Sequence, residues 1–400
     1  MKIGILREGK IPPDRRVTLI PEQCEKAIER YPHLEIVIQP SEIRAYKQNE
    51  YTKHGIKFQE DLSDCDILLG VKEVNIEELI PNKKYIFFSH TYKEQPYNKE
   101  LLRAILDKKI QLIDYELMTK DGERLIAFGR YAGIVGIYNG LKGYNKKLNK
   151  NRLTPAHECH NMSEMLDELI KLRFDPPIKI LITGHGRVAK GAIEVLKKAK
   201  IKEVSNEDFI SKNFETTVFT ILSVDAYCSR ISDDQFDLDE FYANPEGYKS
   251  DFMKYAKHTD LYVACHYWDP RGPVIFTKED ARSPDFKIKM IADISCDIDG
   301  PIPSTLRSST IEDPYYGYDP ILEKEVGFYD DNSIGVMAVD NLPCELPRDA
   351  SRSFGKSFLE HILPALMGND PEKIIERASE TDLQGKLMPD FEYLKDYVNS

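Results

Sequence analysis

The stretch IKILITGHGRVAKGAIEVLKKAK (residues 178–200) joins an apolar run to a helical pattern through a glycine-rich turn. Gly184 permits a tight turn, Gly186 lets the backbone approach a phosphate group, and Ala189 is small enough for close packing of helix on strand. The helix that follows presents free N–H groups and the positive end of its dipole at this turn. The spacing GxGxxA between a strand and a helix therefore predicts a Rossmann nucleotide-binding domain.

Apolar runs that alternate with helical patterns lie on both sides of this turn. Strands are expected upstream at residues 2–6, 34–40, 65–73, 84–90 and 110–116, and downstream at residues 217–222, 260–267 and 289–297. The runs are continuous, as expected for parallel strands that helices cover on both faces. The sequence therefore predicts an α/β fold with two doubly wound parallel-sheet domains, of which the central one is the Rossmann domain.

The length of 400 residues also indicates more than one domain. A basic, polar segment at residues 144–153 and the proline-containing segment FDPP at residues 174–177 separate the two series of strands. These features predict a substrate-binding domain over residues 1–148 and a nucleotide-binding domain over residues 149–344. A helix is expected over residues 348–367, followed by a helical tail.

The composition excludes several classes of protein. A formal net charge of −12 argues against a nucleic-acid or anionic-membrane partner, and no apolar run is long enough to span a bilayer. The seven cysteines are scattered, without a CxxC motif, and the N-terminus lacks a secretory h-region, which predicts a cytoplasmic protein. The stretch AHECH (156–160) lacks the HExxH spacing, so no metal site is expected. A monomer and a homo-oligomer remain open.

Charged and titratable side chains follow several strands of the first domain. They are Arg16 after the first strand, Lys72 and Glu73, His90 and Lys93, and Glu116 after later strands, and Arg124 in the segment beyond. Parallel strands bring their carboxyl ends to one edge of the sheet, where ligands bind. Such a cluster suits a small substrate with carboxylates and an amine. Near other cations a buried Lys72 would have a lowered pKa and act as a base, with His90 as its partner acid.

The residue that reads the ribose is less well defined. The fingerprint expects an acid at the end of the second strand, about 20 residues beyond the glycines. Glu203, Glu207 and Asp208 lie in that window but outside a good strand end, whereas Asp225 ends a better strand and comes later. A carboxylate at this place favours NAD by repelling the 2′-phosphate of NADP. The sequence leaves NAD and NADP both open.

Several longer stretches resemble one known family. They are GILREGKIPPDRRVTLIP at the N-terminus, GVKE, FFSHTYKEQ, IQLIDYELM, RLIAFGRYAGIVG, YVACHYWDPRGP, IADISCDIDGPI, SSTIEDPYYGYD and AVDNLPCELPRDAS. Together they cover most of the chain from residue 1 to about residue 365. The chain resembles the lysine-forming saccharopine dehydrogenases, and above all the lysine–ketoglutarate reductase part of the bifunctional aminoadipic semialdehyde synthases. Both are similar to alanine dehydrogenases.

This resemblance implies an NAD(P)-dependent oxidoreductase that interconverts saccharopine with L-lysine and 2-oxoglutarate. It implies that Lys72 is the general base and His90 the general acid, with Glu73 and Glu116 tuning them. The resemblance further implies substrate carboxylate binding by Arg16, Lys93 and Arg124, pyrophosphate binding by Gly184, Gly186, Arg187 and Val188, and nicotinamide contacts from Asp340, Asn341, Leu342 and Pro343. It also implies that C-terminal helices within residues 345–400 complete the substrate domain.

Two alternatives remain at this stage. One is an alanine dehydrogenase-like enzyme with another amino acid as substrate, because those enzymes also use a lysine and a histidine at comparable places. The HTYK and DNLP segments favour the saccharopine reaction over this alternative. The other is an NAD(P)-binding protein without turnover, acting as a sensor or structural protein. The presence of Lys72, His90 and the glycine turn argues against that.

Overall fold

The computed structural model describes residues 1–150 and 153–399 and divides into two compact units. The first unit combines Met1–Phe128 with Pro347–Ser400, and the second comprises Gly129–Leu346. Residue 400, the last of the expected C-terminal segment, lies outside the described residues. The chain therefore leaves the first unit after Phe128 and returns to it at Pro347.

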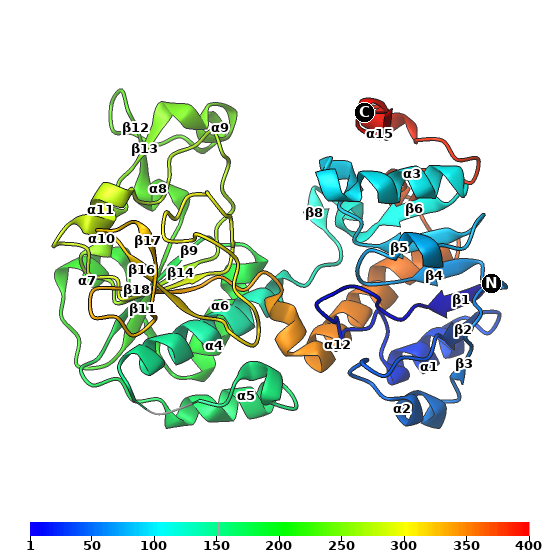
Figure 1. Ribbon diagram of the computed structural model, residues 1–400, viewed down its shortest axis with the longest axis horizontal. Helices are drawn as coiled ribbons and strands as arrows, with labels where there is room; N and C mark the ends of the chain where they lie inside the picture. Colours follow the sequence, from blue (N-terminus) through cyan, green and yellow to red (C-terminus); the bar gives the residue numbers. More distant parts are fainter. Residues whose placement is uncertain (151–152, 400) are drawn as a thin grey trace. The chain divides into compact units, whose positions relative to one another are not determined.

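The first unit is built on a six-stranded parallel sheet (Figure 1). Its strands are β1 (Lys2–Ile5), β2 (Glu35–Ile38), β3 (Lys57–Phe58), β4 (Ile67–Leu69), β5 (Lys84–Phe87) and β6 (Gln111–Asp114), in the order β3-β2-β1-β4-β5-β6. In Figure 1 they follow one another from β6 near α3 to β3 near α2. The chain first extends the sheet on one side of β1 and then crosses to β4 on the other side. This reversal places a topological switch point between β1 and β4.

Both faces of this sheet are buried, which explains its continuous apolar runs. The side chains of Ile67 and Leu69 pack with α1 (Pro21–Arg30) and α12 (Pro347–Ser357) on one face. Leu68 lies on the other face, in a cluster with residues of α3 (Lys99–Asp107). The remaining helices of this unit are α2 (Gln48–Lys53), α13 (Leu363–Leu366), α14 (Ile374–Arg377) and α15 (Leu394–Asn399). The predicted α/β class and doubly wound parallel sheet are confirmed here.

The second unit contains an eight-stranded, mostly parallel sheet. Its strands are β9 (Lys179–Thr183), β10 (Lys202–Glu203), β11 (Val218–Leu222), β14 (Leu261–Ala264), β15 (Met290–Asp293), β16 (Tyr316–Asp319), β17 (Lys324–Val326) and β18 (Ile334–Met337), in the order β10-β11-β9-β14-β15-β18-β16-β17. Strand β16 pairs antiparallel with both β17 and β18, which differs from the wholly parallel sheet that the sequence predicts. Their YGYD and KEV sequences lack the long apolar run that indicates a buried parallel strand.

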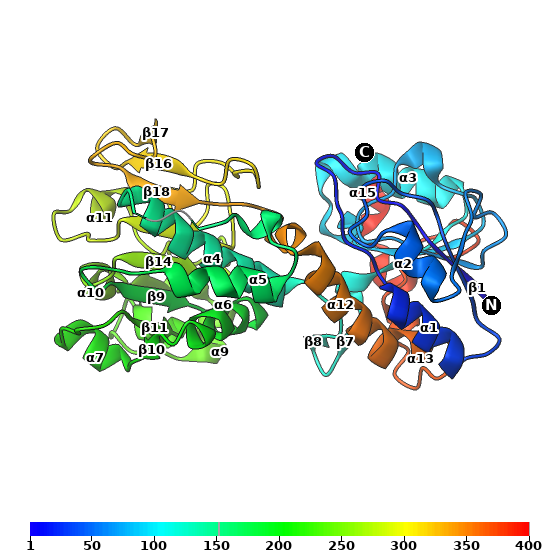
Figure 2. The same cartoon turned by 90° about the horizontal axis from the view of Figure 1, so that it is seen from below.

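Two helices of the second unit, α4 (Gly129–Lys147) and α6 (Arg187–Lys198), run side by side (Figure 2). Gly133 permits this close approach, because a Cβ atom there would collide with the carbonyl oxygen of Val188. Helix α4 also packs on β14 and β15. It therefore belongs to the second unit, although the sequence places residues 129–148 in the first domain. The assignment of a substrate domain and a nucleotide domain stays a prediction.

Shorter elements complete the fold. They are the hairpins β7 (Thr119–Lys120) with β8 (Glu123–Arg124) and β12 (Cys228–Arg230) with β13 (Tyr248–Ser250), and the helices α5 (Met162–Glu168), α7 (Asn206–Ser211), α8 (Val224–Tyr227), α9 (Leu238–Ala243), α10 (Met253–Ala256) and α11 (Lys278–Arg282). Across residues 1–150 and 153–399, no helix combines the length and the hydropathy that a membrane-spanning segment needs.

Candidate active site

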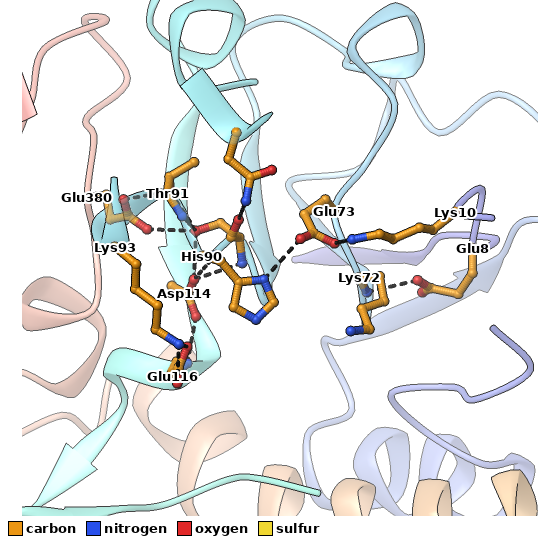
Figure 3. Close-up of polar contacts among 12 residues, drawn as sticks. Glu8, Lys10, Lys72, Glu73, His90, Thr91, Lys93, Asp114, Glu116 and Glu380 are labelled. Atoms are coloured by element: carbon orange, nitrogen blue, oxygen red, sulfur yellow. Dashed lines mark hydrogen bonds and ion pairs between the residues drawn. The ribbon is translucent and has the colours of Figure 1, made fainter. Parts of the chain in front are cut away.

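The carboxyl ends of four neighbouring strands in the first unit carry titratable side chains (Figure 3). Glu8 follows β1, Lys72 and Glu73 follow β4, His90 follows β5, and Glu116 follows β6. Because the strands are parallel and in register, these residues lie along one edge of the sheet. The predicted gathering of Lys72, Glu73, His90 and Glu116 at one edge is what the topology produces.

The backbone at Lys72 is held by a carboxylate that the sequence patterns do not single out. Oε1 of Glu8 accepts a hydrogen bond of 2.7 Å from the N–H of Val71, and Oε2 accepts one of 2.8 Å from the N–H of Lys72. Glu8 therefore ties the end of β1 to the end of β4 across the switch point. Burial raises the pKa of Glu8 to about 7, and the charge of Asp14 acts in the same direction.

The side chain of Lys72 is the candidate base. Burial lowers its pKa below the ordinary lysine value, and the neighbouring Arg16 guanidinium lowers it further. Within the described residues, no hydrogen bond or ion pair engages Nζ of Lys72. A lysine with these properties is more readily deprotonated than a solvated one, so its amine is suited to accepting a proton.

The His90 imidazole is held by Glu73. Nδ1 of His90 lies 2.9 Å from Oε1 of Glu73, and Nζ of Lys10 lies 2.7 Å from Oε2 of the same carboxylate. Although burial acts to raise the pKa of Glu73, its hydrogen bonds with His90 and Lys10 lower it to about 2. An ionised Glu73 accepts the Nδ1–H of the imidazole, which leaves Nε2 as the nitrogen that can exchange a proton with a substrate.

The next carboxylate along the edge joins two cations. Glu116 is 8% exposed, and its oxygens lie 2.8 Å from Nζ of Lys93 and 2.6 Å from Nη2 of Arg124. Burial acts to raise the pKa of Glu116, but the hydrogen bond with Lys93 and the charge of Arg124 hold it below the usual value. The Lys93 and Arg124 side chains are 38% and 50% exposed. Both cations are therefore accessible to an anionic ligand.

Arg16 has a different environment from Lys93 and Arg124. Its residue is 4% exposed, its Nη2 lies 2.5 Å from Oδ2 of Asp14, and its guanidinium stacks over the Phe128 ring at 4.2 Å. The charge of Arg16 is thus already paired within the protein. The guanidinium also acts on Lys72, whose pKa it lowers.

Residues 4–135 match the family model described as alanine dehydrogenase/PNT, N-terminal domain. This segment is similar to that family. Across nearly the whole chain, similarity extends to α-aminoadipic semialdehyde synthase of Arabidopsis thaliana, which is 30% identical over 98% of this chain and 41% of that protein. The mitochondrial synthase of Mus musculus is 32% identical over 89% of this chain and 42% of that protein. The chain therefore spans less than half the length of these relatives.

A second group of relatives matches over most of its own length. Saccharopine dehydrogenase [NAD(+), L-lysine-forming] of Neurospora crassa is 23% identical, and the match covers 82% of each protein. Among solved structures, an L-alanine dehydrogenase superimposes with a TM-score of 0.67 at 14% identity and full coverage of both chains. That likeness establishes a shared fold. The resemblance predicted from the sequence motifs is confirmed.

The second unit carries the glycine turn. Gly184 follows β9 with φ +100°, and a Cβ atom there would lie 2.7 Å from the carbonyl oxygen of Cys265, so only glycine fits without strain. Gly186 is the N-cap of α6, and a Cβ atom at this residue would meet only open space. Arg187 and Val188 begin α6. A glycine-lined, open helix N-terminus fits the pyrophosphate of a dinucleotide.

A substitution at Gly186 separates the role in binding from the role in folding. We expect Gly186→Val to weaken NADH binding by about 10-fold or more while leaving the melting temperature nearly unchanged, because its side chain would occupy the open space at the helix N-terminus. Isothermal titration with NADH and a thermal melt measure the two effects. Gly184→Ala is the matched comparison and should lower the melting temperature. Unchanged NADH affinity in Gly186→Val would contradict the assignment.

The order of strands in the sheet distinguishes between Asp225 and Glu203 as the carboxylate that would bind the ribose of the cofactor. Strand β11 pairs directly with β9, and the Gly184 N–H donates to the carbonyl of Leu222 at the end of β11. The exposed Asp225 lies just beyond that strand, beside the glycine turn. Glu203 lies on the edge strand β10, which β11 separates from β9. Position in the sheet therefore favours Asp225, although its place in the sequence is later than the fingerprint expects.

The segment expected near the nicotinamide follows β18, at the same edge of its sheet as the glycine turn. Asp340 is exposed and Asn341 half-buried. Leu342 and Pro343 are buried and begin the short helix η8 (Leu342–Glu345). Of the four residues, Asp340 and Asn341 are thus the ones whose side chains reach the surface of this unit.

Sequence reasoning missed several residues that shape the site. They are Glu8, Lys10 and Asp14 in the N-terminal segment, Asp114 at the end of β6, and Glu380 in the C-terminal segment. The first three lie inside the stretch REGKIPPDRR, whose density of charges was a usable signal. Across the part of the chain that the structure describes, no group of three or more His, Cys, Asp or Glu side chains is arranged to hold a metal ion.

Proposed function

We propose that this protein is an NAD(P)-dependent oxidoreductase that interconverts saccharopine with L-lysine and 2-oxoglutarate. The observation that carries the proposal is the placement of Lys72 and His90 after the adjacent strands β4 and β5, with Glu73 bound to the imidazole. Homology to saccharopine dehydrogenases and aminoadipic semialdehyde synthases over most of the chain supports this choice of substrate.

The proposed chemistry needs a base and an acid with different proton affinities. A bound nicotinamide nucleotide would accept the hydride when the secondary amine of saccharopine is oxidised. The neutral amine of Lys72 accepts a proton from the substrate amine and passes it to solvent, and it then accepts a second proton from the water that attacks the imine carbon. Nε2 of His90, with Nδ1 fixed by Glu73, donates a proton to the leaving amine as the carbinolamine collapses, and the proton of the carbinolamine hydroxyl is released to solvent. The products are lysine and 2-oxoglutarate.

The cations around Glu116 are proposed to bind the substrate carboxylates. Lys93 and Arg124 share one carboxylate, and their side chains are 38% and 50% exposed, so both are accessible to a second anion. Arg16 is proposed to act on the substrate mainly through its positive charge, since Asp14 already occupies its guanidinium. Glu73 and Glu116 hold the cationic and imidazole groups in place.

The cofactor preference is proposed to depend on Asp225. We expect Asp225→Ser to shift the ratio of kcat/KM for NADH over NADPH by about 10-fold or more towards NADPH, because the mutation removes a carboxylate that repels the 2′-phosphate. Steady-state kinetics with each cofactor measure the ratio. Glu203→Ser, on the edge strand β10, is the matched control and should leave it unchanged. A change of this ratio in Glu203→Ser but not in Asp225→Ser would assign the discrimination between cofactors to Glu203 on β10.

An assay of cofactor oxidation tests the reaction itself. Purified protein receives NADH or NADPH together with 2-oxoglutarate and L-lysine, and in parallel wells with 2-oxoglutarate and ammonia, or with pyruvate and ammonia. Lysine-dependent oxidation is the expected result, and it also identifies the cofactor. Oxidation only with pyruvate and ammonia would replace the proposal by an alanine dehydrogenase activity. Cofactor binding without oxidation in any well would favour a non-catalytic role. The cytoplasmic location stays a prediction, and the oligomeric state stays open.

A further inference from the structure

A buried polar network lies behind the candidate acid His90 (Figure 3). Oγ of Ser89 lies 2.6 Å from Oδ2 of Asp114, 2.8 Å from Oε1 of Glu380 and 2.6 Å from Oγ1 of Thr91. Oγ1 of Thr91 in turn lies 2.7 Å from Oε2 of Glu380. All four residues are 0% exposed. Two carboxyl groups therefore meet around one serine hydroxyl without solvent.

The hydroxyl groups of Ser89 and Thr91 carry too few hydrogen atoms to bond two ionised carboxylates in this arrangement. Three of these contacts join a hydroxyl group to a carboxyl oxygen, and each is short enough to require a proton between the atoms, but the two hydroxyl groups supply only two. Ser89 cannot donate to Asp114 and Glu380 at the same time. A proton on Glu380 resolves the conflict: its acid O–H donates to Ser89, Ser89 donates to Asp114, and Thr91 donates to the other oxygen of Glu380.

The network fixes the backbone at His90. Oδ2 of Asp114 also accepts hydrogen bonds from the N–H of Ser89 at 2.8 Å and from the N–H of His90 at 3.3 Å. His90 has φ 56°, a left-handed conformation that is strained for a non-glycine residue. Such a conformation persists only when its surroundings hold it. Asp114 provides those bonds, and Glu380 holds Asp114 through Ser89.

We propose that Glu380 is a positioning residue for catalysis, whose protonated carboxyl holds Ser89 and Thr91 and thereby keeps the His90 imidazole in place. This inference rests on the proposed function for its catalytic part only. The C-terminal segment supplies the group: the Glu380 N–H donates to the carbonyl of Leu112, and the Asp114 N–H donates to the carbonyl of Ala378. Residues 378–380 thus run along β6 and deliver the carboxyl to the end of that strand.

The surroundings favour the acid form. Among the described residues, the titratable groups coupled to Glu380 are Asp114, Tyr393 and Tyr397, which are not cations. The His90 imidazole and the Lys93 ammonium, in the segment that follows Ser89, are bound instead to Glu73 and Glu116. Burial raises the pKa of Glu380 to about 8, and the charge of Asp114 acts in the same direction. Asp114 and Glu380 titrate as a coupled pair, because burial also raises the pKa of Asp114.

The difference between the pKa of Glu380 in the folded protein and in the unfolded chain determines how the free energy of unfolding changes with pH. The folded protein retains on Glu380 a proton that the unfolded chain releases near its ordinary pKa of 4.5. The free energy of unfolding contributed by this group therefore decreases as pH rises from about 4.5 to about 8. A glutamine at this position can copy the acid, because its amide donates to Ser89 and its carbonyl accepts from Thr91. It does so without titrating.

The test compares Glu380→Gln, Glu380→Ala and the wild type in the full chain. Glu376→Gln is the matched control, because Glu376 lies four residues earlier with its side chain 57% exposed, in a surface ion pair with Lys373. Melting temperatures are measured from about pH 6 to about pH 8.5. The saccharopine assay gives kcat and KM over the same range, with rates expressed per folded protein.

We expect the melting temperature of Glu380→Gln minus that of wild type to increase by about 2 °C or more as pH rises across this range. The same difference should stay constant for Glu376→Gln. We also expect Glu380→Ala to lower kcat by about 10-fold with unchanged KM for the nicotinamide cofactor, because it releases the His90 backbone. Glu380→Gln should keep kcat within about 2-fold of wild type near neutral pH.

Two results would overturn the proposal. A melting-temperature difference for Glu380→Gln that does not change with pH would show that Glu380 is ionised in the folded protein. Equal loss of kcat in Glu380→Gln and Glu380→Ala would show that the carboxylate, and not a neutral hydrogen-bonding group, is needed. The melting experiment requires no substrate. It therefore tests the buried proton even where the assay finds no saccharopine activity, and the two proposals can fail separately.

Discussion

We expect the Lys72→Met variant to lose turnover by roughly 10²-fold or more, because methionine fills the space of the lysine stem but accepts no proton. The pKa of Lys72 is lowered by burial and by the Arg16 guanidinium, so the wild-type rate should gain from deprotonation of this amine as pH rises. The variant should lose that dependence. Steady-state kinetics across pH in the saccharopine-oxidising direction measure both effects, and titration with NADH should give an unchanged dissociation constant.

Lys57→Met is the matched control for this experiment. Lys57 is an exposed residue of β3 at the far edge of the same sheet, so the same chemical change should leave kcat and its pH profile unaltered. Near-normal turnover in Lys72→Met would remove Lys72 from the reaction. A loss of NADH affinity in the same variant would instead indicate that the fold is perturbed.

The second large effect is expected at His90. We expect His90→Gln to lower kcat by roughly 10²-fold or more, because glutamine can still donate a hydrogen bond to Glu73 but cannot transfer a proton to the leaving amine. The backbone network through Asp114 does not involve the imidazole, so the melting temperature should change little. The kinetics of saccharopine cleavage and a thermal melt provide the two measurements.

His54→Gln serves as the control, because the first unit contains a second histidine–carboxylate pair. Nδ1 of His54 lies 2.7 Å from Oε2 of Glu25, but this pair joins α2 to α1 and not the strand ends. We expect His54→Gln to keep full turnover. If His90→Gln retained wild-type activity as well, the proton donor would have to be sought among other groups at the edge of the sheet.

Local sequence patterns predicted the fold class because helix and strand periodicities are properties of neighbouring residues. The runs around Leu68 and Ile86 indicated parallel strands, and the positions of Lys72 and His90 at their ends followed from that topology. The glycine turn was equally readable, since strand, turn and helix are contiguous. The antiparallel strands β16 and β17 were missed because short polar strands carry no such periodicity.

Other parts of the site depend on contacts between distant segments. Sequence reasoning treated Arg16 and Arg124 alike, whereas the structure pairs Arg16 with Asp14 in the interior and leaves Arg124 half exposed. The choice of Asp225 over Glu203 depended on which strand pairs with β9, and strand order is not a local property. These differences arise from burial and pairing, which no window of neighbouring residues encodes.

The sequence by itself determined that the chain is an α/β protein with a glycine turn typical of nucleotide-binding domains, and that Lys72, Glu73, His90 and Glu116 follow parallel strands. Only the tertiary structure decided that Glu8 holds the Lys72 backbone and that Glu380 reaches Ser89 across a separation of 291 residues. The physical reason is that strand ends are set by local hydrophobic periodicity. Proton affinities and hydrogen-bond partners are set instead by which distant groups are buried together.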